Sequence, residues 1–264
     1  LALLRAHRGG DAVTGIVAGG MFVFARLAGL LMTMPVLGAA GVPPYARLAA
    51  ALPLTVLLLP AGGAPVPATL SALLGAVIGE ALLGAAMGFC MYVAFSAITI
   101  AGDLASAQSG LQMGAMLDPV TLAQPGPLGA LAGWLGTGVF LGAGLHLRCV
   151  EALGASFREV PAGGVGAAFV GGAVVAELVG ATLVTAIRLA GPLTLFLFAV
   201  NLALSVVNRM APGLQLFFAI GTTLQVVAGV VVLAAALPSV LGAWLSGLPA
   251  ALAAMDALAR LAGG

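Results

Sequence analysis

The chain has 264 residues, of which 62% are hydrophobic and 6% are charged, and its mean hydropathy is +1.22. Ordinary soluble domains carry about 25% charged residues, so this composition excludes a soluble fold and predicts an integral membrane-type protein. Nine basic and eight acidic residues nearly cancel, which gives no electrostatic basis for binding nucleic acid. Cys90 and Cys149 stand alone in apolar surroundings and fit neither a metal site nor a disulfide framework.

Hydrophobic segments separated by proline and glycine predict an all-α fold. A spanning helix needs about 20 apolar residues. The predicted helical segments are 12–34, 45–60, 68–107, 128–160, 173–190, 192–208, 214–237 and 240–261. The segment 68–107 is longer than one bilayer crossing, so we expect it to be bent or to lie partly outside the membrane. Pro212 and Gly213 predict a sharp turn, and Pro238 predicts a kink or a helix end.

A polar break at 108–127 divides the N-terminal helices, 12–107, from the C-terminal helices, 128–261. It contains glutamines, Asp118, prolines and glycines, which resist regular helix. Irregular backbone at membrane depth survives only inside protein or along a water-filled cavity, so the break indicates a conduit rather than a simple anchor. Met113 and Met116 are soft enough to close around a passing chain, although they fit ordinary filler packing equally well.

Two further patterns describe how the helices pack. Five prolines crowd the region 35–60, which favours short, broken helical hairpins over upright spans. Glycines also recur four residues apart, and such pairs let backbones approach closely. These glycine pairs fit either packing inside the chain or docking onto other subunits. The pairs are Gly15/Gly19, Gly75/Gly79, Gly84/Gly88, Gly129/Gly133 and Gly138/Gly142.

Six charged residues interrupt the apolar segments, where a charge is costly. Asp103 and Arg209 fit helix ends at the membrane interface. Glu80 is the most isolated, and we expect it to pair with an arginine inside the protein or on a neighbouring subunit. A proton relay is disfavoured because no second acid shares its face. The six are Arg26, Glu80, Asp103, Glu177, Arg188 and Arg209.

No catalytic constellation is present in the sequence. His146 and Glu151 are five residues apart, so they do not share a helix face and make a poor metal pair. There is no glycine-rich phosphate loop and no metalloprotease or β-lactamase motif. The sequence therefore predicts a protein that is not an enzyme and that holds no metal or cofactor.

Five groups of motifs follow one another between about Phe22 and Gly229. They are Phe24-Ala-Arg26, Met34-Pro35, Val42-Pro43, Arg47 and Pro60; Glu80 with Gly84, Gly88 and Phe89; Gln108-Ser-Gly-Leu-Gln-Met and Leu117-Asp-Pro119; His146, Ser156-Phe157 and Pro161; and Pro192, Asn201, Arg209-Met-Ala-Pro212 and Phe217. In this order they resemble the FliR family of flagellar type III export-gate proteins and its injectisome counterpart, SctT.

The resemblance implies a single export-gate domain over 1–264 that assembles into a helical, multi-subunit gate. It implies FliP-like and FliQ-like partner subunits, an FlhB-like protein at the entrance, and unfolded export substrates in transit. The implied location is the flagellar basal body in the bacterial inner membrane. By position, the pore plug would be Gln108, Ser109, Gly110, Leu111, Gln112, Met113, Gly114, Met116, Leu117, Asp118 and Pro119.

We also expect Arg26, Glu80, Gly84, Gly88 and Arg209 to lie at subunit interfaces. The sequence departs from the family at Thr222-Thr223, where members often carry a proline. The wording of the central motif favours a flagellar protein, with an injectisome subunit as the alternative. A secondary transporter is a further alternative, motivated by the broken helices and buried charges, but the two halves show no internal symmetry.

Overall fold

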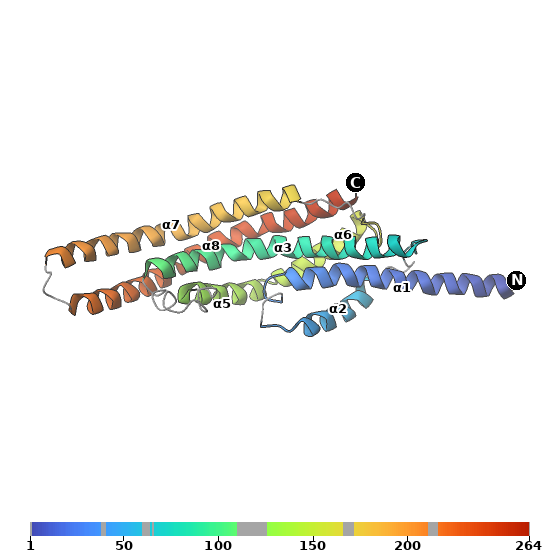
Figure 1. The fold of residues 1–264 in the computed structure, drawn as a ribbon, viewed down its shortest axis with the longest axis horizontal. Helices are drawn as coiled ribbons and strands as arrows, with labels where there is room; N and C mark the ends of the chain where they lie inside the picture. The colour runs from blue at the N-terminus through green and yellow to red at the C-terminus, as the bar shows by residue number, and fades with distance from the viewer. Residues whose placement is uncertain are drawn as a thin grey trace. The chain divides into compact units, whose positions relative to one another are not determined.

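The structure is a computed structural model that describes residues 2–37, 41–59, 64, 66–109, 126–165, 172–210 and 216–263. All regular structure in these ranges is α-helical, as Figure 1 shows, and the all-α prediction is confirmed. The helices are α1 (Ala2–Thr33), α2 (Pro44–Leu58), α3 (Leu70–Gln108), α5 (Pro127–Gly142), α6 (Leu145–Glu159), α7 (Gly172–Met210) and α8 (Leu216–Gly263).

Four of the described helices are long and apolar enough to cross a membrane. The spans are Val13–Thr33, Leu70–Gln108, Gly172–Ala203 and Ala234–Gly263. The pair α5 and α6 would make a fifth if it counts as one broken span. The structure thus supports the integral membrane prediction, and α3 runs without a break over about 58 Å, which exceeds the roughly 30 Å hydrocarbon layer.

The hydrophobic segment 128–160 is divided between two helices. It forms α5 and α6, whose axes are bent by 61°. Gly144 adopts φ +68°, a left-handed conformation that a glycine tolerates because it lacks a Cβ. This glycine lies within an apolar segment of the sequence, and the length of that segment does not predict a bend.

The predicted helix boundary at Pro192 was wrong. The segments 173–190 and 192–208 form the single helix α7, with Pro192 inside it. At Pro238, where the sequence predicts a kink or a helix end, α8 continues, so the helix does not end there. A proline removes one helical hydrogen bond, and neighbouring groups in a membrane protein can compensate for that loss. The predicted turn at Pro212 and Gly213 lies outside the described residues.

The chain, for which the sequence predicts a single domain, packs as two compact units. Unit 1 contains residues 1–93, 144–179 and 249–264, and unit 2 contains residues 94–143 and 180–248. The core of unit 1 includes Phe22, Leu30 and Leu83, all fully buried. In unit 2, the ring of Phe95 lies edge-on to Phe140 at 6.1 Å and to Trp244 at 5.6 Å, and the Trp244 indole donates to the Ala94 carbonyl.

Glycines form the contact between α1 and α3 within unit 1. A Cβ atom at Gly84 would overlap the backbone of Arg26, and one at Gly88 would overlap Thr33 and Leu30. Gly29, on α1, faces α3 in the same way, because a Cβ there would overlap the Ala81 carbonyl. The Gly84/Gly88 pair therefore serves packing inside this chain.

We predict that Gly84→Ala lowers the free energy of unfolding by about 2 kcal/mol, because two rigid backbones would have to separate. Gly138→Ala is the matched control, since a Cβ there meets nothing within 4 Å. That change should be neutral or stabilising by up to about 1 kcal/mol through helix propensity. Chemical denaturation in detergent measures both, and equal stability of the two variants would contradict the close α1–α3 contact.

Candidate functional site

A buried ion pair lies at the centre of unit 1. Arg26 on α1 and Glu80 on α3 are both fully buried, and Nε of Arg26 lies 2.5 Å from Oε2 of Glu80. The predicted pairing of Glu80 with an arginine is confirmed, and the partner lies inside this chain. A pair so deeply buried needs further hydrogen bonds to offset its desolvation.

Further hydrogen bonds to this pair come from α6 and the segment that follows it. Nη1 of Arg26 donates to Oγ of Ser156 at 2.9 Å, and Nη2 donates to the Val160 carbonyl at 3.1 Å. The Arg26 guanidinium also stacks 4.0 Å from the ring centroid of Phe157, a cation–π contact. Oε1 of Glu80 accepts a 2.8 Å hydrogen bond from the Gly163 N–H.

Gly163 can take part because it adopts φ +86° and packs against the ring of Phe22. A side chain there would be strained and would overlap that ring. One arginine and one glutamate thus join α1, α3, α6 and the segment after α6. Sequence reasoning identified Glu80 and Arg26 but missed Ser156 and Gly163 as their partners.

A second polar cluster, in unit 2, anchors the far end of the predicted break. Asp103 and Ser106 are three residues apart on α3, so they share a helix face. Oδ1 of Asp103 accepts from the Gly126 N–H at 2.7 Å, and Oγ of Ser106 accepts from the Leu128 N–H at 2.8 Å. These amides begin α5, where N–H groups lack helical partners, so α3 caps α5 from outside.

The near end of the break is held by α7 and α8. Nδ2 of Asn201 donates to the Gln108 carbonyl at 3.0 Å, at the last residue of α3, and Gly229 packs against Ser109. The ends of the segment 110–125 are therefore both fixed on the end of α3. Both anchors depend on polar side chains that lie on apolar helices. These residues are visible in the sequence, but hydropathy alone does not single them out as anchors.

Most of the predicted plug residues lie outside the residues that the structure describes. Gln108 and Ser109 are described at the end of α3, and Ser109 is buried. Gly110, Leu111, Gln112, Met113, Gly114, Met116, Leu117, Asp118 and Pro119 lie outside the described residues.

The predicted interface residues divide into two groups. Arg26, Glu80, Gly84 and Gly88 all make contacts inside unit 1, and the two charged side chains are fully buried there. Arg209 is exposed in the last turn of α7. A role at subunit interfaces stays a prediction for all five. In the ranges that the structure describes, no three His, Cys, Asp or Glu side chains gather as a metal ion would require.

The fold and these two clusters define an apolar helical protein held together by buried polar contacts. Residues 17–249 match the family described as bacterial export proteins, family 1. Two similar relatives are named flagellar biosynthetic protein FliR. That of Escherichia coli K12 is 32% identical over 81% of this chain and 82% of its own length. That of Caulobacter vibrioides is 29% identical over 84% of this chain and 89% of its own length.

A FliR of Aquifex aeolicus is 29% identical over 81% of this chain and 83% of its own length. The chain belongs to the FliR family of bacterial export proteins. The match to the family includes the Arg26–Glu80 pair, the break and its anchors.

We predict that Glu80→Gln lowers the free energy of unfolding by about 3 kcal/mol, because it leaves the buried Arg26 without a counter-charge. Glu151→Gln is the control: Glu151 and Arg148 are 3.7 Å apart and about two-thirds exposed, so its loss should cost less than about 1 kcal/mol. Denaturation midpoints in detergent measure both. Replacing both Arg26 and Glu80 by methionine should recover much of the lost free energy of unfolding. If the double variant is as unstable as Glu80→Gln, the loss is not due to the unpaired charge alone.

We predict that Ser106→Ala exposes the Leu128 amide to faster hydrogen exchange, because this buried N–H loses its acceptor. Asp103→Ala should do the same at Gly126, with a loss of about 1–2 kcal/mol in the stability of the α5 start. Ser246→Ala is the control, since Ser246 is exposed and donates only within its own helix, to Ala243. Unchanged exchange at the two amides would show that α5 does not need its caps from α3.

Proposed function

We propose that this chain is the FliR-type subunit of the flagellar type III export gate. In this role it joins FliP-like and FliQ-like subunits around a channel for unfolded flagellar proteins, with an FlhB-like protein at the entrance. The observation that carries the proposal is the family match over 17–249, which includes the break and both of its anchors. The names of the relatives favour the flagellar system over an injectisome.

The bacterial inner membrane, within the flagellar basal body, is the proposed location. The four spans that are apolar enough to cross a membrane support it. Transport through such a gate requires a shaped passage and no bond-making chemistry in this subunit. The proposed work of the chain is therefore mechanical and structural, with energy supplied elsewhere in the export apparatus.

The segment Gln108–Pro119 is the proposed plug of the channel. Its support is the arrangement on either side of it: Asn201 and Gly229 hold one end, and Asp103 and Ser106 hold the other. A plug that moves and returns needs fixed attachment points. Without them, each opening would also shift the neighbouring helices out of their packing. Both attachment points here lie on helices.

We predict that deleting residues 111–117 leaves the complex with FliP-like and FliQ-like subunits intact but makes membranes permeable to small solutes. The anchors at residues 103, 106, 126 and 128 lie outside the deletion, and the nine remaining residues of 110–125 still span up to about 30 Å. Co-purification checks assembly, and solute uptake by proteoliposomes checks sealing.

The control replaces 111–117 by seven glycine and serine residues, which keeps the length and removes the methionine and leucine side chains. If the length of the segment is enough to seal the channel, the replacement stays tighter than the deletion. Intact complexes that remain tight after the deletion would refute the plug. Failure of the unaltered chain to co-purify with either subunit would refute the gate assignment itself.

A further inference from the structure

A pocket of about 200 Å³ lies between α6 and the C-terminal end of α8, within unit 1. Four of the seven residues that line it are charged, although only 6% of the chain is. The charged residues of this α6–α8 pocket are Arg158 and Glu159 on α6, and Asp256 and Arg260 on α8. The two helix ends pack closely, because a Cβ atom at Gly263 would lie 2.9 Å from the Glu159 carbonyl oxygen.

The four charged side chains of the pocket are exposed and unpaired. In the ranges that the structure describes, no ion pair or hydrogen bond reaches any of them. On the same helix, by contrast, Arg148 and Glu151 do form an ion pair, at 3.7 Å. Two arginines and two carboxylates thus line one pocket without pairing with one another. Their charges are available to a ligand.

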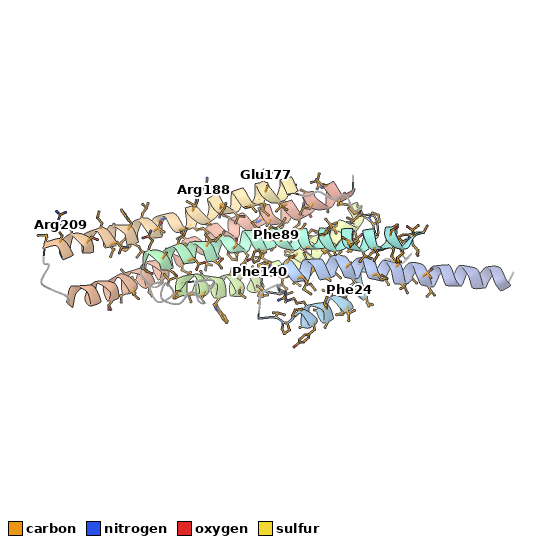
Figure 2. The ribbon with its side chains drawn as sticks, viewed as in Figure 1. Phe24, Phe89, Phe140, Glu177, Arg188 and Arg209 are labelled. Atoms are coloured by element: carbon orange, nitrogen blue, oxygen red, sulfur yellow. The ribbon has the colours of Figure 1, made fainter. Side chains whose placement is uncertain are left out.

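Charges elsewhere on the apolar helices are isolated. Figure 2 shows Arg188 projecting outward from α7, and no other charged residue lies within two helical turns of it in the sequence. The α6–α8 pocket instead gathers charges of both signs from two helices that are separated in sequence by the whole of α7. Convergence of polar side chains from different elements on one hollow is typical of a binding site.

The signs of the charges define the chemistry of the ligand. A simple anion would be attracted by the arginines but repelled by Glu159 and Asp256, and a simple cation would meet the reverse. A ligand without net charge that holds a negative and a positive group apart satisfies both pairs. Arginine binds phosphate through two parallel hydrogen bonds, and a primary ammonium has three N–H donors for carboxylates.

The position of the pocket on α8 indicates where such a ligand is found. The span Ala234–Gly263 is about 45 Å long, which equals the thickness of a bilayer with its headgroup layers. Arg260 lies about 5 Å from the end of this span, at headgroup level, and Asp256 lies about 11 Å from it, at the boundary with the hydrocarbon. This end of α8 therefore faces phospholipid headgroups.

Helix α6 has the pattern expected at a membrane surface. Cys149, Leu153 and Ser156 recur on one face and are buried, whereas the charged residues of the helix are exposed. A helix with one buried apolar face and one charged face lies in the plane of the membrane interface. The two helices that form the pocket thus agree on its level in the membrane.

We propose that the α6–α8 pocket binds a phosphate–ammonium zwitterion, the headgroup of phosphatidylethanolamine. The phosphate lies against Arg158 and Arg260, and the ammonium lies against Glu159 and Asp256. Asp256 and Arg260 are offset by about 6 Å along α8, a separation similar to that of a phosphate and an ammonium joined by two carbons. The other three lining residues are alanine or serine, which leave room for the headgroup. The proposal goes beyond the export role and does not depend on it.

Ser156 connects the pocket to the buried ion pair. It lines the pocket, and its Oγ accepts a 2.9 Å hydrogen bond from Nη1 of Arg26. A headgroup that bridges α6 and α8 also holds Ser156 in place, so bound lipid should stabilise the fold of unit 1.

Lipid selectivity of the purified full chain tests the headgroup. The chain in detergent is titrated with phosphatidylethanolamine, phosphatidylcholine and phosphatidylglycerol that carry the same acyl chains, and native mass spectrometry counts the bound lipids. Phosphatidylethanolamine should bind most tightly and should raise the midpoint of thermal unfolding most, because choline lacks N–H donors and glycerol lacks a positive charge. Equal binding of all three lipids, or a preference for phosphatidylglycerol, would overturn the proposal.

Charge variants assign the two halves of the pocket. Arg158→Gln combined with Arg260→Gln should weaken binding of phosphatidylethanolamine about tenfold, because the charge-assisted hydrogen bonds to phosphate are lost. Glu159→Gln combined with Asp256→Asn leaves both arginines, so the preference should switch to the anionic phosphatidylglycerol. If this acidic double variant still prefers phosphatidylethanolamine, the carboxylates do not hold the ammonium and the proposal is wrong.

The control is Arg148→Gln, which removes an exposed arginine of α6 outside the pocket and should leave lipid selectivity unchanged. The replaced side chains are all exposed, so each variant should fold, and its midpoint of thermal unfolding without added lipid checks this.

Free phosphoethanolamine distinguishes a lipid from a soluble ligand. It lacks acyl chains, so it should compete with the lipid only at about a hundredfold higher concentration. If it binds as tightly as the lipid, the zwitterion stands and its source is the aqueous phase rather than the membrane. If neither the lipid nor the free headgroup binds, the pocket is a solvated surface and the proposal is refuted.

Discussion

The guanidinium of Arg26 imposes the strictest constraint on this chain. It is fully buried in a protein with only 6% charged residues, so few other groups can neutralise it. Glu80, Ser156 and the Val160 carbonyl meet that need, and in doing so they fix α1, α3 and α6 against one another. Glycines at the α1–α3 contact let the helices come close enough for the pair to form. Electrostatics and close packing are therefore two aspects of one arrangement.

In unit 2, neutral and acidic side chains pair with backbone groups at helix ends. The start of α5 and the end of α3 have backbone groups without helical partners, and polar side chains from other helices satisfy them. In a water-poor environment such groups cannot remain unpaired, so the polar residues of an apolar chain gather where helices begin, end or bend.

The sequence predicted the fold class because hydrophobic length and composition are strong signals in membrane proteins. It also predicted that Glu80 pairs with an arginine, since isolation made any other outcome costly. It failed at the α5–α6 bend, which depends on one glycine at φ +68°, and at Pro192, which α7 accommodates. Ser156 and Gly163 could not be found, because their partners are 130 and 83 residues away along the chain.

The long separations in the Arg26 cluster have a consequence for biosynthesis. Glu80 lies 54 residues after Arg26 in the chain, and Ser156 lies 130 residues after Arg26. At roughly 5–20 residues per second, the ribosome makes Glu80 about 3–11 s and Ser156 about 7–26 s after Arg26. During that delay the first helix carries an unneutralised cation and is a poor candidate for release into lipid. Stable burial of α1 therefore depends on residues of α3 and α6 that the ribosome makes later.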